Sequence, residues 1–170
     1  MSNETIKYTG TVRLMRVNGR RQKIVRKNKP TKYMMVTLAN ILGRQSIIGC
    51  LPGYIGVYRP KGGVTVTEDA YDISSNWDLF SVGNVPVVSN TTSDGCGVDL
   101  MCQLSPTAIR QESEDGLYLL MVSANEKYAL AYIPIDSSTI KSIVEGATYD
   151  VKWVITFTYE SAVVRPAVVD

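Results

Sequence analysis

A twelve-residue run near the end of the chain limits what this sequence can fold into. From Tyr149 to Glu160, "YDVKWVITFTYE", apolar and aromatic residues alternate with mostly polar ones. Successive side chains of a β-strand point to opposite faces, so this period of two predicts a long strand with one buried face. We expect Trp153 on that buried face. Such a strand needs a sheet around it and a second layer over its apolar side.

Most of the chain after Gly43 favours further short strands. Gly and Pro bound the candidate segments 44–50, 53–59 and 63–68, and the near-continuous apolar run 116–135 reads as a central hairpin. We expect it to turn near Asn125-Glu126, and the turn-rich stretch 72–97 to form a long loop with short strand pieces. About nine short strands and one helix indicate a mainly β fold, an antiparallel β-sandwich with one amphipathic helix. The predicted organisation is a single domain over residues 1–160 and a C-terminal tail over 161–170.

The chain before that body predicts a basic β-hairpin over residues 10–27. Asn18-Gly19 is the strongest short hairpin signal, because a type I′ turn needs positive φ at both central residues. A two-residue turn there places Leu14 opposite Lys23 and Arg16 opposite Arg21. Like charges that face each other on a ladder cost stability, and an acidic partner would relieve them.

After the hairpin, apolar residues recur at helical spacing and predict an amphipathic helix over residues 31–42. Thr31 is the candidate N-cap, and Gly43 is the candidate C′ residue after the last turn. We expect the helix to lie over a face or an edge of a sheet. The apolar stripe consists of Met34, Met35, Leu38, Ile41 and Leu42.

Charge is distributed unevenly along the 170 residues, although the net charge is only +2. Residues 1–33 hold ten Lys and Arg against one acid, which gives +9 and leaves −7 for the remainder. Such asymmetry is typical of an electrostatic docking surface. Single-strand binders interleave stacking aromatics with their bases, and no aromatic lies between Tyr8 and Tyr33, so we favour docking on protein over nucleic acid. The candidate face consists of Arg13, Arg16, Arg20, Arg21, Lys23, Arg26, Lys27 and Lys29.

The residue types present favour a non-enzymatic protein. The chain has no histidine, which removes Ser-His-Asp and Cys-His catalysis and every zinc site that needs an imidazole. We expect no cofactor and no metal, and we interpret the loop carboxylates as solvated or docking groups; a glycoside-hydrolysing pair stays open on spacing alone. No run of about 18 apolar residues predicts a membrane span. The three cysteines favour buried free thiols, with a Cys96–Cys102 bridge as the alternative.

Two stretches resemble known proteins. A basic hairpin with "VNG", then "KNKPT", then a helix ending "LANILG" resembles the start of small structural proteins of tailed bacteriophages, and "YDVKWVITF" is similar to their closing strand. The resemblance covers about 50 of the 170 residues. It implies a virion component made in the host cytoplasm: a capsid decoration or auxiliary protein, a head-fibre base, or a neck or tail accessory. Such a protein would dock on the major capsid protein or another virion protein. We expect its copies to form oligomers that are joined through apolar segments such as Val85–Val88 and the tail.

Two other functions remain open on the sequence. The same hairpin fits a nucleic-acid-binding β domain, since its bases would neutralise several phosphates. A small carbohydrate-binding module would use Trp77 or tyrosines as platforms, because Trp153 is expected in the core.

Overall fold

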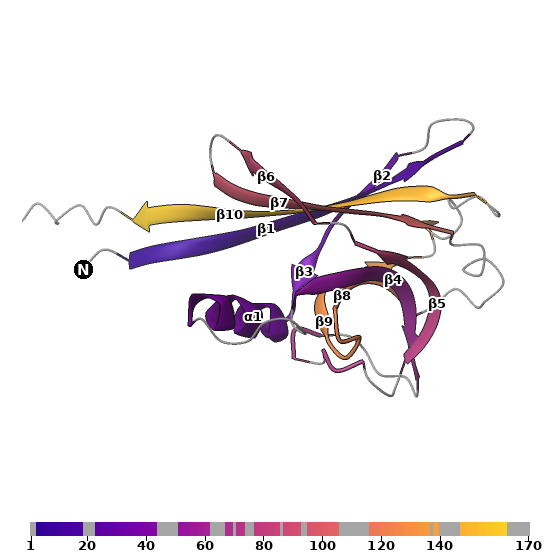
Figure 1. The fold of residues 1–170 in the computed structure, drawn as a ribbon, viewed down its shortest axis with the longest axis horizontal. Helices are drawn as coiled ribbons and strands as arrows, with labels where there is room; N and C mark the ends of the chain where they lie inside the picture. The colour runs from indigo at the N-terminus through magenta and orange to yellow at the C-terminus, as the bar shows by residue number, and fades with distance from the viewer. Residues whose placement is uncertain are drawn as a thin grey trace, which may run out of the picture.

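Two antiparallel five-stranded sheets pack face to face, and one helix lies beside the second sheet (Figure 1). This computed structural model confirms the predicted β-sandwich with a single helix. It describes residues 3–18, 23–43, 51–61, 67–69, 71–73, 77–85, 87–92, 95–105, 116–136, 138–139 and 147–162. Within these ranges the side chains of 3–6, 42, 80–81, 87–92, 95–96 and 159–162 lie outside the description.

Sheet A is organised around the strand that the period of two predicts. In spatial order it consists of β2 (Lys23–Lys27), β1 (Asn3–Arg16), β10 (Tyr149–Ala162), β7 (Gly95–Leu104) and β6 (Val87–Thr92). β1 and β10 pair along their whole length, but β7 pairs with β10 only as far as Phe157 and β2 reaches only as far as Thr11 on β1. The far ends of β1 and β10 therefore continue as a two-stranded arm beyond the other strands (Figure 1).

Sheet B contains the most deeply buried strands. In spatial order it consists of β3 (Lys29–Pro30), β9 (Ala129–Ile135), β8 (Leu117–Ser123), β4 (Pro52–Pro60) and β5 (Trp77–Asn84). Every residue of β8 is buried, and in β9 only Pro134 is exposed, which confirms the predicted central hairpin. Glu126 has φ 60 in the turn between them, where the sequence places the reversal.

The main core fills the space between the two sheets. Trp153 is completely buried there, as predicted. Between Tyr149 and Phe157, the even-numbered side chains of β10 are mostly polar and point outward, whereas the odd-numbered ones are aromatic or aliphatic and point into the core. A second cluster covers the other face of sheet B. It consists of Tyr58, Ile73, Tyr118, Leu120, Val122, Ala129 and Tyr132.

The single helix, α1 (Lys32–Leu42), lies where its periodicity predicts it. Thr31 occupies the N-cap position, but its hydroxyl donates to the Ala129 carbonyl (2.6 Å) and makes no capping bond to the helix. Gly43 is the C-cap residue, one position earlier than the predicted C′, with φ −77; its N–H continues the helical pattern to the Ala39 carbonyl (2.8 Å).

The apolar stripe of α1 is narrower than the sequence predicts. Met34 is 5% exposed, whereas Met35 and Ile41 are 44% and 43% exposed. The helix lies beside the edge of sheet B, against β3 and β9, and a strand edge covers less of a helix than a sheet face does (Figure 1). The prediction that Met35 and Ile41 face the core is therefore wrong.

The register of the N-terminal hairpin differs by one residue from the prediction. Leu14 lies opposite Ile24, not Lys23. A slip of one residue exchanges the two faces of a strand, and this register places Ile24 inward, beside Leu14 and the core. The free energy gained by burying Ile24 is therefore larger than the free energy that a tight two-residue turn would contribute. Gly19, Arg20 and Arg21 lie outside the described residues, and with them the predicted Arg16–Arg21 pair.

Three further expectations need correction or lie outside the description. The stretch 72–97, predicted as a long loop with short strand pieces, contains the full strands β5 and β6 of eight and six residues, because turn-forming residues there stand between pairing strands. β10 continues to Ala162, two residues into the predicted tail. The candidate strand 44–50 and most of the candidate strand 63–68 lie outside the described residues.

Candidate docking surface

The surface of sheet A that faces away from sheet B gathers the exposed basic side chains. On β1, Lys7 and Arg13 point to this outer face, and on β2, Lys23 and Lys27 do. Because these positions alternate with the buried ones, the four bases lie on one side of two paired strands. We call Lys7, Arg13, Lys23 and Lys27 the basic face.

Exposed apolar side chains stand among these bases. Met15 lies opposite Lys23 in the ladder and Val25 lies opposite Arg13. They are 38% and 44% exposed, and Met101 on β7 is 44% exposed. No aromatic side chain points outward from the described outer-face positions of β1, β2, β7 and β10. The outer face therefore offers positive charge and aliphatic contact area, without a stacking platform.

The other half of the outer face carries acidic groups that already have partners. Lys152 on β10 pairs with Asp99 on β7 at 2.6 Å, with side chains 29% and 13% exposed. Gln103 donates to the Asp150 carboxylate at 2.9 Å. Because the carboxylates lie toward β7 and the basic face lies toward β2, the outer face is electrically polarised across the sheet.

A surface hollow of about 460 Å³ lies where these two halves meet. A protein side chain fits a space of this size, which is at the lower end of ordinary ligand sites. The two exposed methionines contribute flexible apolar walls. The hollow is lined by Met15, Asn84, Met101, Cys102, Gln103, Asp150, Val151 and Lys152.

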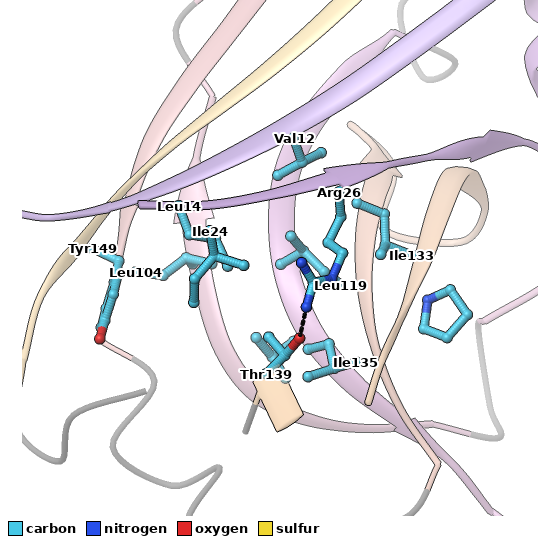
Figure 2. Close-up of a pocket in the computed structure, with 12 residues that line it drawn as sticks. Val12, Leu14, Ile24, Arg26, Leu104, Leu119, Ile133, Ile135, Thr139 and Tyr149 are labelled. Carbon is cyan, nitrogen blue, oxygen red and sulfur yellow. Dashed lines mark hydrogen bonds between the residues drawn. The ribbon is translucent and has the colours of Figure 1, made fainter. Parts of the chain in front are cut away.

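Two of the predicted docking residues point the other way. Arg26 is on the inward face of β2, where its guanidinium donates to the Thr139 hydroxyl (2.8 Å) and lies 3.9 Å from the Asp136 carboxylate (Figure 2). Arg16 is half-buried on the inward face of β1, opposite Tyr149 in the ladder. Arg16 is two residues from Leu14 on β1, and Arg26 is two residues from Ile24 on β2. Because alternate residues share a face, both arginines point toward the other sheet. Arg16 and Arg26 therefore do not share a face with Arg13, Lys23 and Lys27.

The remaining predicted residues divide into three groups. Arg13, Lys23 and Lys27 lie on the basic face, and Lys29 is exposed on β3 at the edge of sheet B. Arg20 and Arg21 lie outside the described residues. The prediction omitted Lys7, although it shares the parity of Arg13, and it omitted the apolar side chains between the bases. The odd-numbered residues of β1 share the outer face with Arg13, and this alternation, together with side-chain exposure, is the signal that would have found Lys7 and the apolar side chains.

Hydrogen bonds to Asp136 keep its carboxylate ionised beside the Arg26 guanidinium. The backbone N–H of Thr139 donates to the Asp136 carboxylate at 2.7 Å and the Ser138 hydroxyl donates at 2.8 Å. Hydrogen bonds from Thr139, and then from Ser138, stabilise the charged form and lower the pKa of Asp136 to about 2. Asp136 therefore stays ionised beside the guanidinium near neutral pH.

The thiol and carboxylate groups in the described part of the chain show no assembled reactive centre. Cys102 is free and buried, and burial raises the pKa of its thiol to about 12, which disfavours the thiolate. Cys96 and Cys102 lie on one strand six residues apart, about 20 Å at strand spacing, so the alternative of a disulfide between them is wrong. Within the described ranges, no three Cys, Asp or Glu side chains come close enough together to hold a metal ion.

The surface carboxylates and Trp77 have protein partners. Asp69 pairs with Lys32, and Asp78 pairs with Lys61 at 3.1 Å. The Trp77 ring is half-buried against Tyr118, with the ring centroids 6.2 Å apart. The carboxylates 112–115 lie outside the described residues.

These features define an antiparallel two-sheet sandwich with a polarised outer face. No helix in the described ranges has the length and apolar character needed to cross a membrane. No family model, curated protein or solved structure matches the chain.

Proposed function

We propose that this chain is a non-enzymatic structural protein that docks on an acidic protein surface through the basic face. The observation that carries the proposal is the placement of Met15 and Val25 between Arg13 and Lys23 on one exposed sheet face. Protein interfaces combine apolar contact at their centre with charge at their rim, and methionine is enriched in them. Electrostatic attraction then steers the encounter with an acidic partner.

The resemblance to small structural proteins of tailed bacteriophages supports a virion as the setting. In that setting the partner is the major capsid protein or another virion protein, and the chain is a capsid decoration, head-fibre or neck or tail accessory that assembles as an oligomer. The excess of basic over acidic side chains on the outer faces of β1 and β2 suits the surface of an acidic protein shell.

Nucleic-acid binding is the alternative use of the same bases. Phosphate contacts need positive charge, which the basic face has. Stacking on unpaired nucleobases needs aromatic side chains, which the described positions of this face lack. Aliphatic groups between the bases add nothing to phosphate binding. The apolar side chains therefore favour protein over nucleic acid.

The experiment compares two variants of the outer face. The charge variant carries R13E, K23E and K27E, and the apolar variant carries M15S, V25S and M101S. Each is expressed in place of the natural protein during infection by the phage that encodes it, and the copy number per purified particle is measured by mass spectrometry. We expect both variants to reduce incorporation at least tenfold, because docking uses charge and apolar contact together.

Two results would oppose the proposal. Particles that never contain the natural chain would remove the virion setting. Binding of the natural chain to duplex or single-stranded DNA at about 150 mM salt, lost in the charge variant but unchanged in the apolar variant, would assign the face to nucleic acid. Unchanged thermal unfolding of both variants is the control for folding.

A further inference from the structure

The two sheets separate along one edge of the sandwich. The chain passes from β2, the edge of sheet A, to β3, the edge of sheet B, through Asn28. β3 pairs with β9 only at Ala131 and Tyr132, so among the described strands Ile133–Ile135 of β9 have no neighbour on that side. β2 likewise has no strand beyond it within the described sheet. In the part of the chain that the structure describes, two strand edges on the same side of the molecule therefore have no neighbouring strand.

An apolar pocket of about 30 Å³ lies between these separating edges (Figure 2). This volume is about that of one water molecule, but aliphatic walls offer a water no hydrogen bonds, so the tip of an aliphatic side chain fits it better. Its walls come from both sheets. They include Leu14, Ile24, Val57, Leu119, Ile133 and Ile135.

Arg26 borders this pocket with a charged group. Its side chain is 41% exposed, and its guanidinium is held by the Thr139 hydroxyl at 2.8 Å. The Asp136 carboxylate is 3.9 Å away, so donors of the planar guanidinium remain available for a further oxygen. An extended segment with aliphatic residues followed by a carboxylate matches this arrangement.

The chain contains such a segment directly after β10. Residues 163–170 read "VVRPAVVD", with four valines, and Asp170 follows the pair Val168-Val169. β-branched residues favour extended structure, and a proline is tolerated in a strand added at an edge. The segment begins beyond Ala162, at the end of the two-stranded arm that projects from the sandwich (Figure 1).

The segment cannot fill the pocket of its own chain. In the pocket, Leu14 lies opposite Val151, which is eleven residues from Ala162 and therefore about 36 Å away along β10. Val168 and Val169 are six and seven residues beyond Ala162, and a fully extended chain reaches at most about 25 Å over that length. Residues 163–170 can therefore reach this pocket only from a second copy.

We propose that the open edge between β2 and β9 receives residues 163–170 of a second copy as an added strand. A valine of the pair Val168-Val169 fills the pocket, and Asp170 lies beside Arg26. Edge addition uses backbone hydrogen bonds for affinity and side-chain pockets for specificity. Because the donor and acceptor surfaces differ, two copies can exchange their segments reciprocally and form a dimer, or successive copies can form a ring or a filament. This inference does not depend on the docking function of the basic face.

The test uses the full chain, a chain ending at Ala162, and a synthetic peptide of residues 161–170. Light scattering should show the full chain as a dimer or larger and the shortened chain as a monomer with the same thermal unfolding. The labelled peptide should bind the shortened chain, and a peptide with V168D and V169D should not. Val57→Ile fills the pocket with one methylene and should weaken peptide binding about tenfold. Val82→Ile, at an exposed position outside the pocket, is the matched control and should not.

Each contrary result overturns the proposal. A monomeric full chain, or a shortened chain that remains an oligomer, removes the second copy as the source. A peptide that fails to bind the shortened chain, or that binds equally after Val57→Ile, removes the pocket as the receiving site.

Discussion

At the scale of single residues, Asn28 connects the two sheets. With its amide oxygen turned toward the donors, it accepts from the Trp153 indole (2.8 Å) and the Thr11 N–H (3.1 Å), and its nitrogen donates to the Tyr8 hydroxyl. A Cβ on Gly10 would lie 2.0 Å from the Asn28 side chain, so only glycine fits there. Burial raises the pKa of Tyr8, which keeps its hydroxyl protonated. One buried amide thus satisfies the core tryptophan where the chain changes sheets.

Replacing Asn28 with alanine tests this role. The buried Trp153 N–H would lose its acceptor, so we expect N28A to lower the free energy of unfolding by about 2–3 kcal/mol, measured by urea denaturation. The exposed neighbouring change Lys29→Ala should stay within about 0.5 kcal/mol of the natural protein. If N28A were as stable as Lys29→Ala, the proposed hydrogen-bond network would be absent.

Cys102 gives a second prediction at this scale. Its thiol is buried and its pKa is raised to about 12, so very little thiolate exists at pH 8. We expect alkylation of Cys102 in the folded protein to be slower by orders of magnitude than in urea, followed by mass spectrometry of the peptide that contains it. Equal rates in both states would contradict the buried placement of this residue.

At the scale of secondary-structure elements, α1 contacts the sandwich through a narrow line of side chains. Met34 packs in the main core and is 5% exposed, while Met35, one residue later, is 44% exposed. We expect Met34→Ala to lower the free energy of unfolding by about 2–3 kcal/mol and Met35→Ala by less than about 0.5 kcal/mol. Urea denaturation measures both. Similar losses in the two variants would mean that the helix packs differently.

The link between β2 and the segment after β9 depends on pH through Asp136. Its pKa is about 2 in the folded protein and 3.8 in the absence of structure, so its stabilisation is complete above pH about 4 and is lost as the pH falls toward 2. We expect D136N to be less stable at pH 7 and to lose less stability between pH 4 and 2. Ser138→Ala removes one of the hydrogen bonds to Asp136. Its loss of thermal stability between pH 4 and 2 should lie between the losses of the natural protein and D136N. An unchanged slope in D136N would contradict this assignment.

At the scale of the whole molecule, the period of two along 149–160 was enough to predict the architecture, since a strand with one buried face needs a sheet and a covering layer. The candidate surface was predicted less well. A count of bases cannot distinguish Arg13 from Arg26, because the face of each side chain depends on strand register. A strong turn signal placed Leu14 opposite Lys23, whereas burial of Ile24 decided the pairing. Matching Leu14 with an apolar partner would have found the register from sequence.

The arrangement of the molecule separates its surfaces. The basic face lies on the outer side of sheet A, with Lys7 on the two-stranded arm, and the apolar pocket lies between the sheets at the β2 and β9 edge. The arm projects beyond the other strands (Figure 1). This separation allows one copy to contact a partner and a neighbouring copy at once. Variants of one surface should therefore leave the other interaction intact.

Lysine footprinting of particle-bound protein tests the docking claim most directly. Free protein and protein in purified particles are treated with an amine-reactive reagent, and the modification of each lysine is measured by mass spectrometry. The account predicts that Lys23 and Lys27 react several times more slowly in the particle, while Lys127, exposed in the turn between β8 and β9, reacts at the same rate in both. Equal reaction of Lys23 and Lys27 in free and bound protein would contradict docking through the basic face.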